Sequence, residues 1–259
     1  MDLKLSGKRV LVTGGNSGLG AAMVRAFAAE QARVAINYVT HPEAAAALAA
    51  QLQGGSAALQ LQADVAQPEA VAAMFRTIDD AWGGLDVLIN NAGIDGERAL
   101  AWEADPAAWN RVLQINLGGA FLCAREALKR MVPQRSGVII NTSSVHEMIA
   151  WSGYSAYAAS KAALSMMAKT LAQEAGAYGV RVLCVAPGAI RTPINAAVWQ
   201  DPAGQKDLIS KIALGRVGEP QDVAGVVVVL ASHVGDYVTG TSVLVDGGMT
   251  DYPAFSHGG

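Results

Sequence analysis

The sequence lacks the features that would place the chain in a membrane, in an oxidising compartment or on nucleic acid. It has two cysteines, Cys123 and Cys184, and both sit in apolar segments, which favours buried free thiols over a disulfide or a metal site. Its basic residues are scattered and form no stripe, so no nucleic-acid partner is expected. No signal peptide is visible, and the apolar run around Val226–Ala231 is too short to span a bilayer. We therefore expect a soluble cytoplasmic protein with no metal and no membrane partner.

Charged residues are also few, and apolar residues are correspondingly many. Charged residues make up 16% and hydrophobic residues 52% of the 259 residues, and the net charge is -3. Such a chain is too apolar for disorder and suggests further surface buried between subunits. Near-continuous apolar runs alternate with helical segments seven times, without a repeat or a linker. This alternation predicts an α/β fold, a Rossmann doubly wound parallel sheet of seven strands with helices on both faces, as one domain over residues 1–259.

Apolar runs and their glycine and proline boundaries place the expected elements along the chain. Strands are expected at Arg9–Thr13, Val34–Tyr38, Ala57–Ala63, Leu85–Asn90, Val138–Asn141, Arg181–Val185 and Ser242–Val245. Helices are expected at Ala21–Glu30, Pro42–Gln53, Pro68–Trp82, Pro106–Met131, Tyr154–Tyr178 and Gln221–Ser232. Asp95–Asp105 is expected to be a surface loop. Ile194–Leu214, within the segment 190–215, interrupts the alternation, and we interpret it as a mobile segment that covers the substrate.

A glycine-rich turn joins the first expected strand to the first expected helix. Its spacing is Gly-x-x-x-Gly-x-Gly, which lets the backbone approach a phosphate while the helix N-terminus supplies N–H donors. The strand before and the helix after favour a dinucleotide site over an ordinary tight turn. The residues expected to contact the cofactor here are Gly14, Asn16, Ser17, Gly18, Leu19 and Gly20.

The end of the second strand lacks the carboxylate that bonds the adenosine ribose in NAD-specific sites, about 20 residues past the glycines. Asn37 and Tyr38 occupy this place, followed by Val39, Thr40 and His41, with no Arg or Lys to bind a 2′-phosphate. Neutral side chains such as Asn37 can bond either a ribose hydroxyl or a phosphate. The sequence therefore permits NAD or NADP, and dual use is expected.

Other candidate cofactor residues fall at the ends of later strands, where ligands bind in open parallel sheets. Asp64 is placed to bond the adenine amino group, or to begin the helix ahead of Pro68, and both roles remain open. Asn91 contacts the ribose and nicotinamide or only braces the sheet. The remaining expected cofactor contacts are Val65, Ala92, Gly93, Pro187, Gly188, Ile190 and Thr192.

Tyr157 and Lys161 are four residues apart, so on a helix their side chains share one face. A nearby ammonium group is expected to lower the tyrosine pKa from about 10 toward a usable value. Ser144 follows an apolar strand thirteen residues earlier and can hold the oxygen that Tyr157 deprotonates. Asn116 lies in an apolar helix, where its amide either bends the helix or anchors a water near Lys161.

These motifs together resemble the short-chain dehydrogenase/reductase family. Thr13-Gly14-x-x-x-Gly18-x-Gly20, Asn90-Asn91-Ala92-Gly93, Asn116, Ser144, Tyr157-x-x-x-Lys161 and Pro187-Gly188 occur in the family's order, over nearly the whole chain. The resemblance implies a catalytic tetrad of Asn116, Ser144, Tyr157 and Lys161, with Tyr157 and Lys161 also contacting the cofactor. It also implies a nicotinamide cofactor and a homotetramer.

Ser143–Glu147, Gly188–Ala196 and Asp246–Phe255 are similar to the bacterial glucose 1-dehydrogenases of this family. That resemblance implies a sugar pocket lined by Asp95, Ser144, His146, Tyr157 and Asn195. It also implies that the tail 250–259 reaches a neighbouring subunit's site. The segment Ala150–Ala156, which flanks Tyr157 on the substrate side, differs from theirs and lacks their Pro and His residues.

The function expected from these residues is NAD(P)-dependent oxidation of a glucose-like aldose at the anomeric hydroxyl to a lactone, with Tyr157 as the general base. Two alternatives remain open. One is a carbonyl reductase of the same family acting on another ketone, such as a 3-oxoacyl thioester. The other is a nucleotide-sensing binding protein without turnover.

Overall fold

The computed structural model describes residues 2–52, 58–192 and 201–251. Seven parallel strands form one sheet in the order β3-β2-β1-β4-β5-β6-β7. Their bounds are β1 Arg9–Val12, β2 Arg33–Tyr38, β3 Leu59–Gln62, β4 Val87–Asn90, β5 Gly137–Thr142, β6 Val180–Pro187 and β7 Ser242–Val245. β1 pairs with both β2 and β4, so the strand order reverses between β1 and β4. The predicted seven-stranded parallel sheet is confirmed, and a ligand crevice is expected at this reversal.

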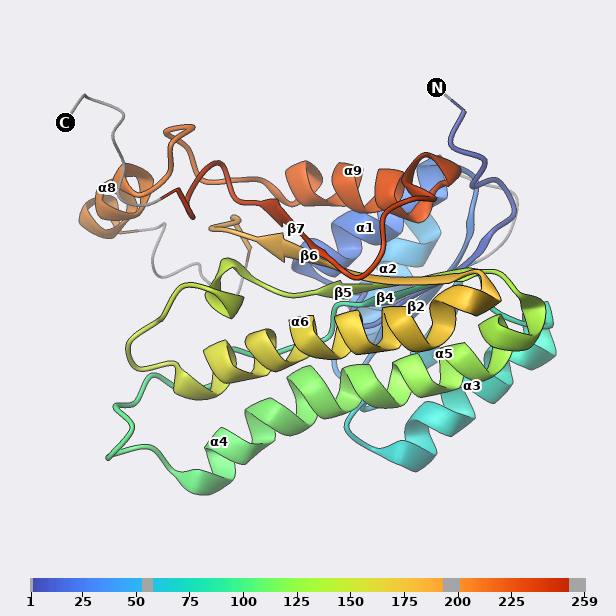
Figure 1. Ribbon diagram of the computed structural model, residues 1–259, viewed down its shortest axis with the longest axis horizontal. Helices are drawn as coiled ribbons and strands as arrows, with labels where there is room; N and C mark the ends of the chain where they lie inside the picture. Colours follow the sequence, from blue (N-terminus) through green and yellow to red (C-terminus); the bar gives the residue numbers. More distant parts are fainter. Residues whose placement is uncertain (1, 53–57, 193–200, 252–259) are drawn as a thin grey trace.

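Helices cover both faces of the sheet (Figure 1), because each face of the buried strands carries apolar side chains. On one face, α1 Gly18–Ala29, α2 Pro42–Gln51 and α9 Pro220–Ala231 share an apolar cluster that includes Phe27 and Ile36. On the other, α3 Pro68–Trp82, α5 Ala120–Gln134 and α6 Ser155–Ala175 share a cluster that includes Phe75 and Ile139. The two clusters are the two halves of one doubly wound core.

The long helix expected at Pro106–Met131 is interrupted. The structure shows α4 Pro106–Leu113, one wide π-type turn, η1 Gln114–Gly119, and then α5. Asp105 begins α4, since its carboxylate accepts from the main-chain N–H groups of Ala107 and Ala108 at 3.2 and 3.1 Å. π-type turns occur often at functional sites, and this one contains Asn116.

The segment Ile194–Leu214, which we interpret from the sequence as a mobile segment that covers the substrate, contains a helix, α8 Pro202–Ser210. Asp201 accepts a hydrogen bond from the Gly204 N–H at 2.8 Å, which begins the helix. Residues 193–200 and most of the tail 250–259 lie outside the described part of the chain. The covering role of 190–215 therefore stays a prediction.

The remaining short helices are η2 Val145–Glu147, η3 Gly176–Tyr178 and η5 His233–Gly235. As expected, Asp95–Asp105 forms neither helix nor strand. Within the described ranges, no helix is long and apolar enough to cross a membrane. The same ranges contain no cluster of three His, Cys, Asp or Glu side chains that could hold a metal ion.

Candidate active site

The glycine-rich turn forms a cradle without room for a side chain. A Cβ atom at Gly20 would lie 2.2 Å from the Gly14 carbonyl oxygen and 2.7 Å from the Asn91 amide nitrogen. Gly14 and Gly18 have φ angles of +58° and +49°, in the left-handed region that glycine adopts readily. Ser17 is extended and α1 begins at Gly18, so free N–H groups at the helix N-terminus face this edge of the sheet.

Asn91 holds the glycine turn against β4. Its amide donates to the carbonyl oxygens of Thr13 and Gly14 at 3.0 and 3.1 Å. The Thr13 hydroxyl in turn accepts from the N–H groups of Asn91 and Ala92, both at 3.0 Å. The Asn91 side chain therefore braces the site, and the small residues Ala92 and Gly93 leave the neighbouring backbone open to a ligand.

The Asn37 side chain braces the same turn from the other side. It is 1% exposed and accepts from the Gly14 N–H at 3.3 Å. Its amide donates to the carbonyl oxygens of Leu61 and Ala63 at 3.1 and 2.9 Å. The side chain therefore has partners within the protein, and its expected contact with a ribose stays a prediction. Tyr38 is likewise buried, in the cluster beneath α1.

Asp64 is held by a basic residue that the sequence analysis did not identify. The Arg111 guanidinium on α4 donates to Asp64 Oδ2 at 2.9 Å, and the Ala66 N–H donates to Oδ1 at 2.9 Å. Partial burial opposes ionisation, but the hydrogen bonds and the charge of Arg111 outweigh it and lower the pKa of Asp64. Asp64 is thus a fixed carboxylate at the strand end, and Val65 beside it packs against Gly119.

Ser144, Tyr157 and Lys161 come together at the carboxyl end of β5, as expected. Burial raises the pKa of the Tyr157 phenol to about 12, although a hydrogen bond with the Ser144 side chain opposes this. Burial also lowers the pKa of Lys161 to about 8. Lys161 Nζ donates to the Thr142 carbonyl oxygen at 2.7 Å and lies 5.4 Å from the centre of the Tyr157 ring. The expected lowering of the Tyr157 pKa is therefore wrong for this geometry, because burial of the phenol outweighs the hydrogen bond with Ser144.

Asn116 lies behind Lys161 and ties two elements together. Its Oδ1 accepts from the Ile94 N–H at 2.9 Å. Its Nδ2 donates to the Ile94 carbonyl oxygen at 2.9 Å and to the Ser160 hydroxyl at 3.1 Å. The side chain is 1% exposed and has protein partners for both of its ends. Its amide thus joins the loop after β4 to α6, and its expected role as the anchor of a water stays a prediction.

Aromatic rings form a wall on the substrate side of Tyr157. The Trp151 ring stacks on His146 with centroids 4.4 Å apart and on Tyr154 at 3.9 Å. The Tyr157 ring meets Trp151 edge-on at 5.7 Å and His146 at 6.2 Å. Sequence reasoning expected His146 here but missed Trp151 and Tyr154. The available signal was two aromatic residues just ahead of Tyr157 in the segment that differs from the glucose dehydrogenases.

Two polar groups of the wall face the catalytic side chains. Asp95 is within electrostatic reach of Lys161 and His146, and burial, which those two charges oppose, raises its pKa. His146 Nδ1–H donates a hydrogen bond to the Ile149 carbonyl oxygen at 3.0 Å, and burial lowers the His146 pKa. Asn195, the other expected substrate residue, lies outside the described residues.

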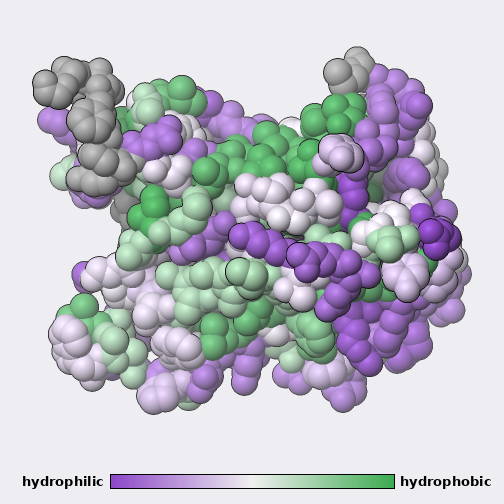
Figure 2. All heavy atoms as spheres, in the orientation of Figure 1, coloured by the Kyte–Doolittle hydropathy of each residue, from purple (hydrophilic) through white to green (hydrophobic). Residues whose placement is uncertain are grey.

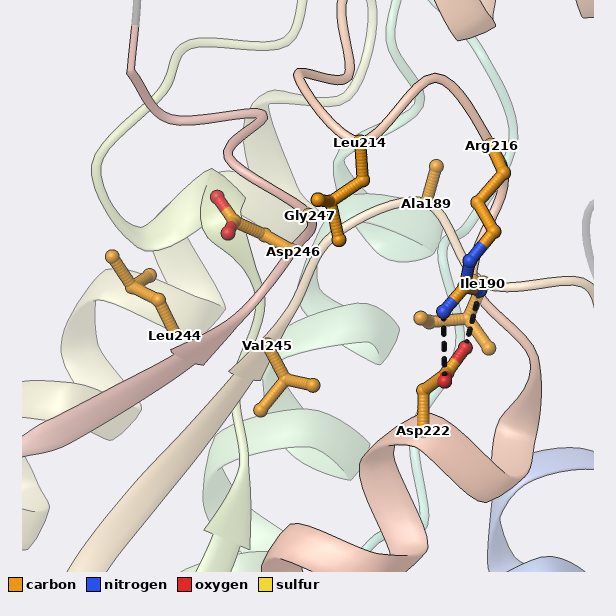
Figure 3. A pocket seen from close by; sticks show the side chains of 10 residues that line it. Ala189, Ile190, Leu214, Arg216, Asp222, Leu244, Val245, Asp246 and Gly247 are labelled. Carbon is orange, nitrogen blue, oxygen red and sulfur yellow. Dashed lines mark hydrogen bonds and ion pairs between the residues drawn. The ribbon is translucent and has the colours of Figure 1, made fainter.

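The segment after β6 borders a separate cavity of about 300 Å³ (Figure 3). Gly188 packs against Asp246, since a Cβ atom there would lie 2.8 Å from the Asp246 Cα. Figure 3 shows Arg216 extended toward Asp222, and the pair forms hydrogen bonds of 2.7 and 3.0 Å. Ile190, an expected cofactor contact, lines this cavity, whereas Ser144, Tyr157 and Lys161 are not among the described residues that line it.

A nicotinamide dinucleotide fits this edge of the sheet. Glycine at position 20 lets α1 pack closely on the turn, because a Cβ atom there would meet the Gly14 carbonyl oxygen. Main-chain N–H groups at this helix N-terminus can then bind a diphosphate. The cradle lies at the reversal of strand order, and Lys161 and Tyr157 lie across the strand ends from it. The group would supply a hydride acceptor or donor.

Comparison with known proteins agrees with this geometry. The model of a family described as enoyl-(acyl carrier protein) reductase matches residues 14–250. A 3beta-hydroxysteroid dehydrogenase of Eggerthella lenta is 45% identical, over 98% of each chain. Glucose 1-dehydrogenase 2 of Bacillus subtilis is 37% identical, over 96% of this chain and 97% of that one. The crystal structure of levodione reductase superposes with a TM-score of 0.91 at 34% identity, over 96% of this chain and 100% of that one.

These relatives confirm the resemblance drawn from the motifs, including the likeness to a bacterial glucose dehydrogenase. They also exclude the alternative of a binding protein without turnover, because the relatives are dehydrogenases over almost their whole length. The cofactor used by the family is NAD or NADP. The chain belongs to the short-chain dehydrogenase/reductase family and is an oxidoreductase that acts on CH–OH groups.

Proposed function

We propose that this enzyme oxidises a secondary alcohol on an apolar ring system, of the kind that a 3β-hydroxysteroid presents, with NAD(P) as the hydride acceptor. The observation that carries the proposal is the aromatic wall. Trp151 stacks on His146 and on Tyr154, and these rings form an apolar cluster next to the Tyr157 ring. Apolar rings such as those of a steroid gain from burying their surface against such a cluster. The Eggerthella lenta relative, at 45% identity, has the matching substrate class in its name.

In the proposed mechanism, the alcohol oxygen lies between the hydroxyl oxygens of Ser144 and Tyr157. Tyr157 acts as the general base in its phenolate form, which takes the hydroxyl proton as the hydride leaves the carbon. Lys161 is buried and positively charged below a pKa of about 8, so it stabilises this phenolate before the proton is taken. Asn116 acts indirectly, because its side chain fixes the Ile94 backbone and the Ser160 hydroxyl beside Lys161.

Oxidation of a glucose-like aldose to a lactone is the second candidate. Asp95 and His146 provide polar groups beside the wall that can bond sugar hydroxyls. The Bacillus subtilis glucose dehydrogenase, at 37% identity, supports the same choice. Aromatic rings also stack on sugar rings, but a sugar needs several hydrogen-bond partners to replace its lost water. The same residues would catalyse the reverse reaction as a carbonyl reductase.

We propose that either NAD or NADP is accepted. The loop after β2 offers no acidic group to repel a 2′-phosphate at Val39 or Thr40. Asn16 ties this loop to the glycine cradle by donating to the Thr40 carbonyl oxygen at 2.8 Å. Gly188, Ile190 and Thr192 are proposed to contact the nicotinamide half, together with Pro187.

A homotetramer is proposed on the basis of an apolar face formed by α4, α5 and α6. Figure 2 shows hydrophobic residues over this side of the molecule, below the middle of the view. A shallow groove of about 570 Å³ runs there between Leu113, Leu117, Phe121 and Met167. Phe121 is 46% and Met166 is 60% exposed, which suits a surface covered by another subunit. The free buried thiols Cys123 and Cys184 support a reducing, cytoplasmic location.

Initial rates with a panel of substrates test the proposal. The panel contains a 3β-hydroxysteroid, its 3α epimer, glucose and simple ketones, each with NAD and with NADP or their reduced forms. The proposal expects the 3β-hydroxysteroid to give a kcat/KM about a hundredfold above that of glucose, the scale of selectivity that differing pocket contacts give. Tyr157→Phe is the control for background reaction. A higher kcat/KM for glucose would replace the first candidate with the second.

A further inference from the structure

Glu147 is a carboxylate that neither the cofactor cradle nor the aromatic wall uses. It lies at the end of η2, three residues after Ser144 and one after His146, and is half-buried. Ser143 donates to Glu147 Oε2 at 2.5 Å, and Ser165 on α6 donates to Oε1 at 3.2 Å. Among the described residues, no Lys, Arg or His forms an ion pair with it. Two serines thus hold a charged group close to the reacting side chains, and the function of this arrangement needs an explanation.

The directions of the serine hydrogen bonds explain why a carboxylate suits this position. Each serine has one proton to donate, and a carboxylate only accepts. Ser143 lies 2.5 Å from Glu147 and 3.3 Å from the Lys161 carbonyl oxygen, so its proton goes to the carboxylate. Ser165 gives its proton to Glu147 and accepts one from Ser242 on β7, whose hydroxyl lies 3.1 Å away. The network therefore has one orientation and ends on the charge of Glu147.

The network attaches to the same stripe of α6 that carries the reacting groups. Tyr157, Lys161 and Ser165 are each four residues apart, so their side chains lie on one face of the helix. Ser143 directly precedes Ser144, and its N–H donates to the Val185 carbonyl oxygen at 2.7 Å. Glu147 closes the loop by donating its own N–H to the Ser144 carbonyl oxygen at 2.9 Å. Movement of Glu147 would therefore shift Ser144 relative to Tyr157.

We propose that Glu147 is a positioning residue, which clamps the loop after β5 to α6 and so sets the distance between the Ser144 and Tyr157 hydroxyl groups. The proposal rests on the proposed roles of Ser144 and Tyr157. It adds a second effect, because Glu147 places a negative charge near Lys161. The groups that face Lys161 are Asp95 from the loop after β4, Cys184 from β6, Glu147 from η2 and Tyr157 from α6 itself.

The negative charge of Glu147 changes the pKa of Lys161 in a definite direction. Together with Asp95, it raises the Lys161 pKa against the larger effect of burial, which lowers that pKa to about 8. Without the carboxylate, Lys161 would lose its proton at a lower pH. Oxidation needs the Tyr157 phenolate and the Lys161 charge together, so the rise of the rate with pH would level off at a lower pH.

Four variants test the clamp with whichever alcohol the wild-type enzyme oxidises. Glu147→Ala and Ser165→Ala remove it, Glu147→Gln keeps one acceptor without the charge, and Glu174→Gln is an exposed control on α6. We expect kcat to fall about tenfold or more in the two alanine variants, since small displacements of reacting groups cost up to about a hundredfold. The dissociation constant for NADH should change less than about twofold. In Glu147→Gln the pH at which the rise of kcat levels off should move to a lower value.

Hydrogen exchange of peptides that cover Val145–Ile149 provides a test that needs no substrate. Exchange of this segment should rise in Glu147→Ala and Ser165→Ala but not in Glu174→Gln. Wild-type kcat in both alanine variants would overturn the proposal, even with faster exchange, because the clamp would then only stabilise the fold. If the wild type oxidises no alcohol while exchange still rises in the alanine variants, the proposed function fails and the clamp is supported.

Discussion

The cofactor side and the substrate side of this active site are built from different groups. On the cofactor side, main-chain N–H groups and small residues form a cradle, held by the side chains of Asn37 and Asn91. On the substrate side, the stacked rings of His146, Trp151 and Tyr154 form a wall. The cradle recognises backbone-sized groups such as phosphates, and the wall offers apolar area. Cofactor chemistry and substrate choice are therefore separable in this molecule.

The difference shows how each side tolerates change. The cradle is closely packed and is held by hydrogen bonds to backbone atoms. One added side-chain carbon should therefore weaken cofactor binding, because the backbone cannot shift to make room for it. A wall of stacked side chains can lose one ring and still leave a site for a different substrate. Substitutions on the two sides should therefore affect different kinetic constants.

The largest effect is expected where the two sides meet, at Tyr157. Tyr157→Phe should lower kcat by about a hundredfold to ten-thousandfold, the range for loss of a general base. NADH binding, measured by fluorescence titration, should stay the same because the ring remains in place. Tyr154→Phe keeps its stacking on Trp151 and serves as the control. Equal kcat values for Tyr157→Phe and the wild type would remove Tyr157 from the mechanism.

Gly20→Ala tests the cradle. The new Cβ would lie 2.2 Å from the Gly14 carbonyl oxygen, so the turn must shift. The dissociation constant for NADH should rise by about a hundredfold, or about 3 kcal/mol. In Gly225→Ala on α9, the new Cβ meets nothing within 4 Å. That control should bind NADH normally and stabilise the protein by about 0.5–1 kcal/mol. Unchanged NADH binding in Gly20→Ala would show that the cradle does not hold the cofactor.

Trp151→Ala tests the wall. It removes the ring that stacks on both His146 and Tyr154, so kcat/KM for a 3β-hydroxysteroid should fall about tenfold to a hundredfold. NADH binding should stay within about twofold of the wild type. Trp102→Ala is the matched control, since Trp102 is 80% exposed. If the two tryptophan variants behave alike, the wall does not select the substrate.

The smallest effect expected is a gain in the free energy of unfolding when Lys161, which lies between the cofactor side and the substrate side, is replaced by an uncharged residue. Lys161 has a pKa of about 8 in the folded protein against 10.5 normally, so folding at pH 7 must bury its charge. Lys161→Met should abolish oxidation yet raise the free energy of unfolding at pH 7 by about 1–3 kcal/mol. Between about pH 8 and 10.5 the wild type becomes more stable, because only its unfolded state still holds the proton, and the difference should shrink. Urea unfolding at several pH values measures the difference in stability between Lys161→Met and the wild type. Lys169→Met, which changes an exposed residue of α6, is the control. A loss of stability in Lys161→Met would contradict the prediction.

The sequence by itself determined the sheet, the family and the positions of Ser144, Tyr157 and Lys161. Each of these depends on spacing along the chain: apolar runs at strand length, glycines in one turn and two side chains one helical turn apart. It did not determine the contacts of Asn37 and Asn116, since each side chain can offer the same amide to a ligand or to the protein. Only the folded chain shows their partners, Gly14 and Leu61 for one and Ile94 and Ser160 for the other.

Only the tertiary structure shows the stacked rings around Trp151, the Arg111–Asp64 pair and the hydrogen bonds of Glu147. These contacts either join residues far apart in sequence, as between Arg111 and Asp64, or depend on ring orientation, and neither kind leaves a periodic trace in the sequence. The Tyr157 pKa shows the same limit. Sequence spacing placed an ammonium group one turn away and predicted a lowered value, but burial, which only packing sets, raised it to about 12.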